Sequence, residues 1–390
     1  MSHKILMLGG RRAGKSSILA SILYALGEQD KTADLCTITD QTDYGGMAVP
    51  LTTKRKEIDN YLRTRSRVGA NSNFLVDMTP SKTESTYTLL TQIGGRCEVA
   101  FDFVDVPGEW MCATSTNHNR LKELVTESDV FIIAIDTPYL MQEENPNINS
   151  VYNRIDEITN MMANITILNE QLDRKMIIFC PVKCERWTQK GQADIVTEKV
   201  CQAYRNLINN WVKHSAVDIW VMPIETVGGI THSKMLDGYR VYRNERDKIG
   251  ELGSVNELTG QIMMGDGMMI SEDAVYMVEP KPDPTLFIDF TQIPLSWYKT
   301  TDGVFKPHFC EQPAYHILTF LVEKEKAVDA FEKKKIDDLP WWRIFTKIFA
   351  RSFGKNLKAY TELISNFNNR NIIKYSGDGF MRVVDIIEKN

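Results

Sequence analysis

Short runs of apolar residues recur along the chain, and segments with apolar positions at helical spacing separate several of them. The short runs are rich in β-branched and aromatic residues, which is typical of buried strands. They cover Lys4 to Leu8, Val99 to Val104, Val130 to Ile135, Met176 to Cys180 and Ile219 to Met222. Alternation of this kind predicts an α/β fold with a mostly parallel sheet and helices on both of its faces.

Four segments have the apolar spacing of amphipathic helices. They are Lys15 to Leu26, Ser150 to Leu172, Gln192 to Lys213 and Ala314 to Phe331. A run of alternating polarity from Tyr87 to Ile93 precedes the glycine pair of GGRC. Together with the strand that follows it, this run predicts an antiparallel hairpin.

Two long segments interrupt the pattern and are predicted to be insertions. The first covers about residues 36–85 and contains a predicted helix, TTKRKEIDNYLRTRSRV. The second covers about residues 230–312, is rich in Gly, Met, Asp and Pro, and is predicted to be irregular. We therefore expect one domain over residues 1–331, followed by a helical appendix over residues 332–390 that ends in a small hairpin around SGDG.

Composition places the chain among ordinary globular proteins, because 43% of its 390 residues are hydrophobic and 25% are charged. We expect neither a membrane span nor a signal peptide. The seven cysteines are odd in number and lack a repeated CxxC pattern, which indicates reduced thiols and a cytoplasmic protein. A net charge of -5 provides no general basic field, so no nucleic-acid partner is expected.

The strongest motif lies between the first predicted strand and the first predicted helix. Gly9, Gly14, Lys15 and Ser16 match the phosphate-loop pattern G-x-x-x-x-G-K-[ST]. Glycines let backbone N–H groups turn toward phosphates, and the helix N-terminus adds positive potential. Lys15 is predicted to reach the terminal phosphates and Ser16 to ligate Mg²⁺. The expected nucleotide contacts of this loop are Gly9, Arg11, Arg12, Ala13, Gly14, Lys15, Ser16 and Ser17.

A second motif ends the strand near residue 104. In FDFVDVPGEW, Asp105 and Gly108 form the pattern D-x-x-G. ATP-hydrolysing proteins with a phosphate loop commonly have a pair of acidic residues at the end of the corresponding strand instead. Asp105 is predicted to hold Mg²⁺ through water, and the Gly108 N–H to sense the γ-phosphate. At these residues the chain resembles the TRAFAC class of P-loop GTPases. The resemblance implies a Ras-like three-layer fold, GTP as substrate, GDP as product and Mg²⁺ as cofactor.

The base-recognition motif departs from the usual pattern of that class, which is Asn/Thr-Lys-x-Asp. Here MIIFCPVKCERW places Val182, Lys183 and Glu185 after the next strand. The Lys183 stem is predicted to stack on the purine, and Glu185 to accept two N–H groups that guanine has and adenine lacks. The alternative is a solvated Lys/Glu pair. Thr226, in MPIETVGGI, lies where these GTPases place a backbone amide against the guanine carbonyl.

The catalytic residues are expected near the phosphate loop. Guanylate-binding proteins, which belong to the same class, carry a cis-acting arginine at the position of Arg12, so Arg12 is predicted to assist catalysis with Lys15, and Arg11 is its backup. The alternative is that both arginines point to solvent or pair with acids of the switch. Glu109 replaces the Gln or His that orients water in many relatives. Because a γ-phosphate repels a carboxylate, Glu109 predicts slow turnover.

Two further expectations concern the first switch and the appendix. The threonine whose hydroxyl joins Mg²⁺ in the GTP state is expected at Thr79, with Thr83 as the second choice. Residues 340–353 have an amphipathic pattern, with Trp341, Phe345 and Phe349 on the apolar face. Such a helix packs on its own domain, docks on a partner or lies on a membrane, and we favour the first interpretation.

The insertions, PVKCERW and CEQPAYHILTFL are similar to bacterial double-GTPase families of predicted conflict systems. We therefore expect a GTP-binding molecular switch with slow, magnesium-dependent hydrolysis. Its partner is predicted to be an unidentified protein effector or another GTPase chain. The main alternative is a nucleotide-binding scaffold that does not hydrolyse GTP, and the D-x-x-G motif disfavours an ATPase or a P-loop kinase.

Overall fold

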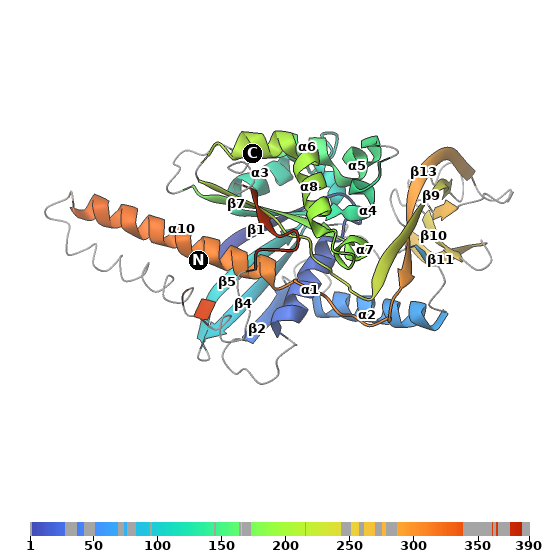
Figure 1. Cartoon of the computed structure of the whole chain (residues 1–390), viewed down its shortest axis with the longest axis horizontal. Helices are drawn as coiled ribbons and strands as arrows, with labels where there is room; N and C mark the ends of the chain where they lie inside the picture. The colour runs from blue at the N-terminus through green and yellow to red at the C-terminus, as the bar shows by residue number, and fades with distance from the viewer. Residues whose placement is uncertain are drawn as a thin grey trace.

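A mainly parallel sheet forms the middle of a mixed α/β structure (Figure 1). This computed structural model describes residues 2–27, 37–42, 51–68, 74–75, 83–93, 96–143, 146–163, 165, 173–214, 216–242, 251–256, 261–269, 275–277, 287–337, 361, 364–365 and 375–383. Within these residues the sheet has eight strands in the order β14-β8-β7-β6-β1-β5-β4-β2. Their bounds are β1 (Ser2–Leu8), β2 (Thr37–Thr42), β4 (Ser85–Ile93), β5 (Arg96–Asp105), β6 (Val130–Asp136), β7 (Lys175–Val182), β8 (Val217–Val221) and β14 (Met381–Arg382).

The predicted strands and hairpin are confirmed. Strands β5, β1, β6, β7 and β8 run parallel in that order, and β4 pairs antiparallel with β5. The register places Ser85, the first residue of β4, opposite Asp105, the last residue of β5. The carboxyl ends of the parallel strands therefore meet at one edge of the sheet, where the phosphate loop and the D-x-x-G motif follow β1 and β5.

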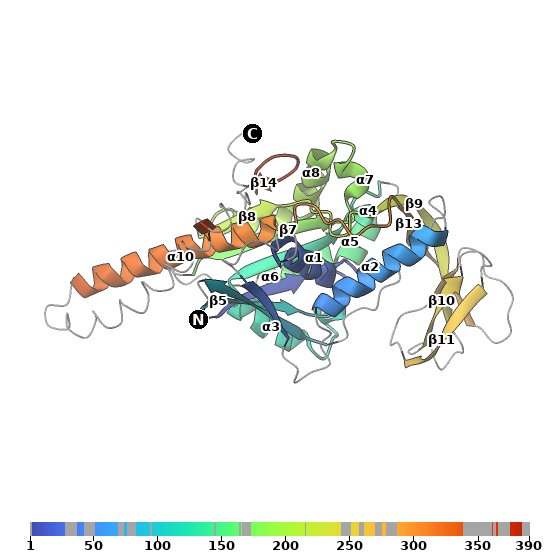
Figure 2. The ribbon, with the colours of Figure 1, turned by 90° about the horizontal axis from the view of Figure 1, so that it is seen from below.

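Helices cover both faces of the sheet, as the alternation predicted (Figure 2). On one face lie α1 (Lys15–Gly27) and α10 (Gln312–Asp337), and on the other lie α3 (His118–Glu127), α6 (Ile155–Met162), α8 (Ala193–Ala203) and α9 (Arg205–Trp211). Alternate residues of β1 face the two layers: Ile5 and Met7 join the core under α1, whereas Leu6 and Leu8 join the core under α3. All four side chains are fully buried.

Two helices predicted as continuous are divided in the structure. The segment from Ser150 to Leu172 covers the second half of α5 (Pro146–Asn153) and all of α6, separated by Arg154 in a left-handed conformation with a φ of 55°, and its residues 166–172 lie outside the described ones. Asn153 binds the end of β6, because its Oδ1 accepts the Asp136 N–H at 2.7 Å. The segment predicted from Gln192 to Lys213 divides at Tyr204 into α8 and α9. The spacing of apolar residues could not indicate the break at Arg154, since the break accompanies the contact of Asn153 with β6, which is distant in the sequence.

The first insertion contains the predicted helix, which is α2 (Leu51–Val68). The second insertion is not irregular as predicted, because it forms β9 (Ile230–Tyr242), β10 (Glu251–Asn256), β11 (Gln261–Met269), β12 (Val275–Met277) and β13 (Phe287–Thr300). Strands β9 and β13 pair along most of their lengths, with two shifts of register. Such strands depend on each other and carry a weak local signal.

The two insertions share one sheet, with the strand order β12-β9-β13-β3. Its strand β3 (Phe74–Leu75) comes from the first insertion and pairs with Trp297 and Tyr298 of β13. Figure 1 shows this sheet at the side of the central sheet, near one end of α2. The two insertions are therefore joined through β3, whereas β2 of the first insertion pairs with β4 in the central sheet.

The first arm of the predicted C-terminal hairpin, before Tyr375, lies outside the described residues, and the second arm pairs with the central sheet. Met381 and Arg382 form β14, which pairs antiparallel with the edge strand β8. The Phe380 side chain is buried in the core, and Arg382 Nε donates to Asp218 Oδ1 at 2.7 Å. Pairing with an existing edge strand buries more of this segment than an isolated hairpin would. The predicted helix over residues 340–353 lies outside the described residues.

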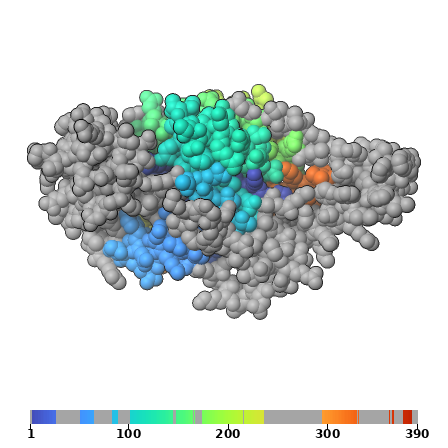
Figure 3. Space-filling model, turned by 180° about the vertical axis from the view of Figure 1, so that it is seen from behind, coloured from blue at the N-terminus to red at the C-terminus, as the bar shows by residue number. Residues whose placement is uncertain are grey.

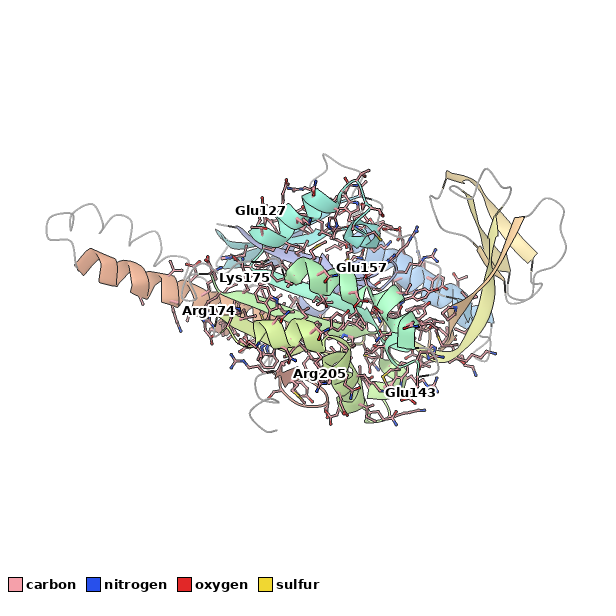
Figure 4. The ribbon with its side chains drawn as sticks, turned by 90° about the horizontal axis from the view of Figure 1, so that it is seen from above. Glu127, Glu143, Glu157, Arg174, Lys175 and Arg205 are labelled. Atoms are coloured by element: carbon pink, nitrogen blue, oxygen red, sulfur yellow. The ribbon has the colours of Figure 1, made fainter. Side chains whose placement is uncertain are left out.

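Ion pairs attach α10 to the edge of the sheet opposite the phosphate loop. Lys324 Nζ of α10 donates to Asp129 Oδ1 at 2.6 Å, directly before β6. Arg174 Nη2, directly before β7, donates to Glu323 Oε2 at 3.4 Å. Figure 4 shows Arg174 and Lys175 beside α10. Among the helices in the described part of the chain, none combines the length and the apolarity that crossing a bilayer requires.

Candidate functional site

The phosphate loop occupies the turn between β1 and α1, and its glycines are required by geometry. Gly9 has a φ of 142° and Gly14 a φ of 101°, which are conformations that L-residues with side chains rarely adopt. A Cβ on Gly9 would lie 2.6 Å from Ala134 O of β6. Arg12 also lies in the left-handed region, with a φ of 59°. The loop backbone is therefore curved as a phosphate-binding loop requires.

Lys15 and Ser16, the first residues of α1, lie where the sequence predicted. Lys15 Nζ donates to Gly9 O at 3.1 Å and to Gly10 O at 3.3 Å, so the ammonium group lies over the loop. Burial lowers the pKa of Lys15, although Asp105 and Glu109 act in the opposite direction. A buried ammonium group with this surrounding is well placed to bind an anionic ligand.

Two of the three predicted magnesium ligands, Ser16 and Asp105, meet across the site. Ser16 Oγ donates to Asp105 Oδ2 at 2.6 Å, and Asp105 is fully buried at the end of β5. Hydroxyl and carboxylate oxygens suit Mg²⁺, which usually takes one or two protein carboxylates and completes its shell with phosphates and water. Within the described residues no three His, Cys, Asp or Glu side chains form a metal cluster. The Ser16 hydroxyl and the Asp105 carboxylate fit a metal that takes its remaining ligands from phosphates and water.

The D-x-x-G segment packs directly against the phosphate loop. Gly108 begins the short helix η1 (Gly108–Met111), and a Cβ at this position would lie 2.5 Å from Arg11 N. Arg11 Nε lies 3.0 Å from Glu109 Oε1. Arg11 thus pairs with an acid of the predicted switch, which was the alternative to a catalytic role for the arginines. The Arg12 side chain is half-buried in the same loop.

Lys183 connects the base-recognition motif to the phosphate loop. It has a φ of 56°, and its Nζ donates to Arg12 O at 2.9 Å. The same ammonium group forms an ion pair with Asp136, a buried residue at the end of β6. Burial raises the pKa of Asp136, and Lys183 opposes this effect. Asp136 was not among the site residues predicted from the sequence, although an acidic residue at the end of the apolar strand VFIIAID is a signal for it.

Glu185 is buried, so it does not belong to a solvated surface pair. Glu185 is the first residue of the short helix α7 (Glu185–Thr188), and its Oε1 lies 3.5 Å from Gly228 N. Burial raises the pKa of Glu185 to about 7. Thr226 lies in the same loop as Gly228, and its carbonyl accepts a hydrogen bond from the Ser21 hydroxyl of α1 at 2.5 Å. The structure therefore brings together Glu185 and the loop that was predicted to contact guanine.

The expected first-switch residues are described only in part. Thr79 lies outside the described residues. Thr83 is exposed and lies two residues before Ser85, which pairs with Asp105. Of the remaining predicted contacts, the Ala13 N–H donates to Gly10 O at 3.2 Å, and the Ser17 side chain is half-buried in the first turn of α1.

Comparisons with known proteins give structural similarities alone. No protein-family profile and no curated protein sequence matches the chain. The GTPase-like domain of S. cerevisiae Ski7 bound to GTP matches at 16% identity over 58% of this chain and 43% of that chain, with a TM-score of 0.30. An ADP-ribosylation-factor-like protein, SAR1 of Encephalitozoon cuniculi in complex with GDP, matches at 9% identity over 57% of this chain and 69% of that chain, with a TM-score of 0.25.

A third solved structure, sup35 complexed with GMPPNP, matches at 13% identity over 58% of this chain and 37% of that chain, with a TM-score of 0.26. The match spans less than half of the Ski7 and sup35 chains. At these TM-scores the similarity assigns neither a function nor site residues to this chain.

Proposed function

We propose that this protein is a GTP-binding molecular switch that hydrolyses GTP slowly in the presence of Mg²⁺. The observation that supports the proposal most strongly is the Ser16–Asp105 hydrogen bond beside Lys15. This contact joins the phosphate loop to the D-x-x-G segment. A divalent cation between these two oxygens and the phosphates would replace that hydrogen bond when the nucleotide binds.

At the phosphate end, the loop N–H groups and Lys15 bind the negative charge. Lys15 exchanges its two carbonyl acceptors for phosphate oxygens, which are stronger partners because they are charged. Ser16 and Asp105 would hold a Mg²⁺ ion, which would further neutralise the charge of the phosphates. Gly108 already contacts the loop, so an N–H group at this position is placed to respond to a γ-phosphate.

At the base end, Glu185 provides the selectivity for guanine. Its ionised carboxylate has two oxygens that accept hydrogen bonds, which match the two adjacent N–H groups on guanine. Lys183 spans from this motif to the Arg12 carbonyl, so its aliphatic stem lies between the base end and the phosphate end of the site. Adenine would leave the buried carboxylate without donors, and that costs binding free energy.

For hydrolysis, we assign Arg12 to the charge that develops on the γ-phosphate and Glu109 to the attacking water. Arg11 compensates the charge of Glu109, so the carboxylate is less strongly repelled by the phosphates. A carboxylate held in an ion pair orients the attacking water poorly, and we therefore expect slow turnover. The same ion pair supports a second candidate function, a nucleotide-binding scaffold without hydrolysis, because it occupies both groups.

The remaining assignments concern partners and location. We propose that the nucleotide state controls a protein effector or a second GTPase chain, as the resemblance to double-GTPase families implies, and that the protein acts in the cytoplasm. The sheet that β3 of the first insertion shares with β9, β12 and β13 of the second is separate from the central sheet, and we propose it as the place of the effector contact.

Two experiments test the proposed function together. The nucleotide that co-purifies with the protein is released by denaturation and identified by chromatography, and we expect GDP or GTP. Phosphate release from GTP is then measured in the parent and in Lys15→Ala. A switch releases phosphate slowly and loses this activity in Lys15→Ala, a scaffold contains nucleotide without releasing phosphate, and bound adenine nucleotide would contradict both.

A further inference from the structure

Arg120 of α3 forms a two-bond contact with Glu84, which directly precedes β4. Arg120 Nε donates to Glu84 Oε2 at 3.1 Å, and Nη2 donates to Glu84 Oε1 at 3.0 Å. Both oxygens of the carboxylate and two nitrogens on one edge of the guanidinium are used, which is the fork geometry of a strong Arg–carboxylate pair. The remaining nitrogen, Nη1, donates to Glu123 Oε2 at 3.2 Å within the same helix.

The contact joins the start of β4, which is paired with the proposed magnesium ligand Asp105, to α3. Glu84 stands between Thr83 and Ser85, and Ser85 is paired with Asp105. Helix α3 is the first α-helix after the Gly108–Met111 turn. Figure 3 shows the start of β4 and α3 next to each other on one face of the molecule. The ion pair therefore bridges the start of β4 and the helix that follows the D-x-x-G motif.

The value of this ion pair is geometric. The Arg120 side chain is 41% exposed and the Glu84 side chain 26% exposed, and ion pairs at such positions contribute little to folding stability. Two parallel hydrogen bonds nevertheless fix both the separation and the relative orientation of their groups. A contact with little effect on stability and a strong effect on orientation suits a positioning role.

We propose that Arg120 is a positioning residue that holds the start of β4, and with it Thr83, beside the proposed magnesium site. This inference rests on the proposed function. Through Glu84, α3 and the start of β4 move as one unit, so the γ-phosphate contact of Gly108 and the magnesium contact of the first switch form together. Loss of the fork separates the two events and weakens Mg²⁺ binding in the GTP complex.

The test compares variants of the full chain in Mg²⁺ titrations of GTP turnover. For Arg120→Ala we expect the Mg²⁺ concentration at half-maximal rate to rise at least fivefold and kcat to fall at least threefold, with GDP affinity unchanged. Arg120→Lys keeps the charge and loses the fork, so it should resemble Arg120→Ala. The reversed pair, Glu84→Arg with Arg120→Glu, restores the contact and should recover most of the parental Mg²⁺ dependence.

Glu123→Ala is the matched control, because it removes a contact of the same arginine that does not bridge the two segments. It should have the parental Mg²⁺ dependence. Glu84→Gln provides a second way to weaken the fork if Arg120→Ala does not fold. A parental Mg²⁺ dependence in Arg120→Ala and Glu84→Gln would overturn the positioning role while leaving the proposed function intact. A parent whose turnover and GTP binding are both independent of Mg²⁺ would overturn the proposed function, and this inference with it.

Discussion

Arg11 and Glu109 form an ion pair, with 3.0 Å between Nε and Oε1, that links the phosphate loop to the residue after the switch glycine. The contact explains why an acid is tolerated beside a phosphate site, since the arginine compensates its charge. It also gives the two neighbouring arginines different positions: Arg11 binds the switch, whereas Arg12 turns through a left-handed conformation and its carbonyl accepts Lys183.

Arg11→Ala should lower the affinity for GTP about tenfold while changing GDP affinity much less, because an uncompensated Glu109 carboxylate then faces the γ-phosphate. Binding of a non-hydrolysable GTP analogue and of GDP is measured by calorimetry. The double variant Arg11→Ala with Glu109→Gln should recover the parental ratio. A GTP to GDP ratio that stays parental in Arg11→Ala would show that the ion pair does not sense the γ-phosphate.

Arg12→Ala should lower kcat at least tenfold and change GTP affinity only a few-fold, because a further cation matters most where charge shifts during bond cleavage. Single-turnover hydrolysis is followed over a range of protein concentrations, since self-association can turn the side chain toward the phosphates. Lys183→Met, which removes a cation at the Arg12 carbonyl, serves as a comparison and should affect binding more than kcat. Parental hydrolysis by Arg12→Ala at every concentration would exclude Arg12 as the catalytic arginine.

Glu185 should make GTP binding dependent on pH. Burial raises its pKa to about 7 in the empty protein, so the fraction with a protonated carboxyl grows as the pH falls from 8 to 6. A protonated carboxyl offers guanine one acceptor fewer, and GTP affinity should therefore decline in this range. Glu185→Gln should bind GTP more weakly at pH 8 and show little pH dependence. Parallel curves for the parent and Glu185→Gln would refute the assignment.

The same shift has a consequence for stability. A carboxyl whose folded pKa is raised above the unfolded value of about 4.5 binds more protons in the folded state than in the unfolded state over the interval between the two values. The contribution of Glu185 to the stability of the empty protein should therefore decrease as the pH rises from about 4.5 to about 7. Thermal unfolding of the parent and Glu185→Gln in this interval isolates that contribution.

Asp136→Ala should destabilise the protein by about 3 kcal/mol, because it leaves Lys183 without its partner in a largely buried ion pair. The double variant Asp136→Leu with Lys183→Met removes both charges and should recover most of this stability. Its affinity for GTP should nevertheless stay well below that of the parent, since the Lys183 contact with the Arg12 carbonyl is lost. Chemical unfolding and GTP binding are measured on the same samples. Full GTP affinity in the stable double variant would contradict the bridging role of Lys183.

Features carried by contiguous residues were predictable from the sequence. The phosphate loop directly follows β1 in the chain, and Asp105 and Gly108 lie close together in the chain at the end of β5. Their positions in the fold therefore followed once those two strands were recognised. The ion pair between Asp136 and Lys183 was not predictable in this way, because Asp136 ends β6 and Lys183 follows β7, and no local pattern in either segment indicates that the two side chains meet.

The same limit applies to the fold. Strands β9 and β13 owe their length to pairing with each other, and β14 owes its form to the free edge of β8. The break at Arg154 accompanies the contact of Asn153 with β6. In each case long-range pairing decides between conformations that local composition leaves nearly equal.

The central claim is that Lys15 and Glu185 bind the two ends of one guanine nucleotide. Competition against a fluorescent GTP analogue tests it most directly, with GTP, GDP and ATP titrated into the parent, Lys15→Ala and Glu185→Ala in the presence of Mg²⁺. We expect GTP and GDP to compete at least 100-fold better than ATP, Lys15→Ala to lose binding, and Glu185→Ala to lose mainly the guanine preference, at a cost of about 1.5–3 kcal/mol. Equal competition by ATP and GTP in the parent, or unchanged affinity in Lys15→Ala, would contradict the account.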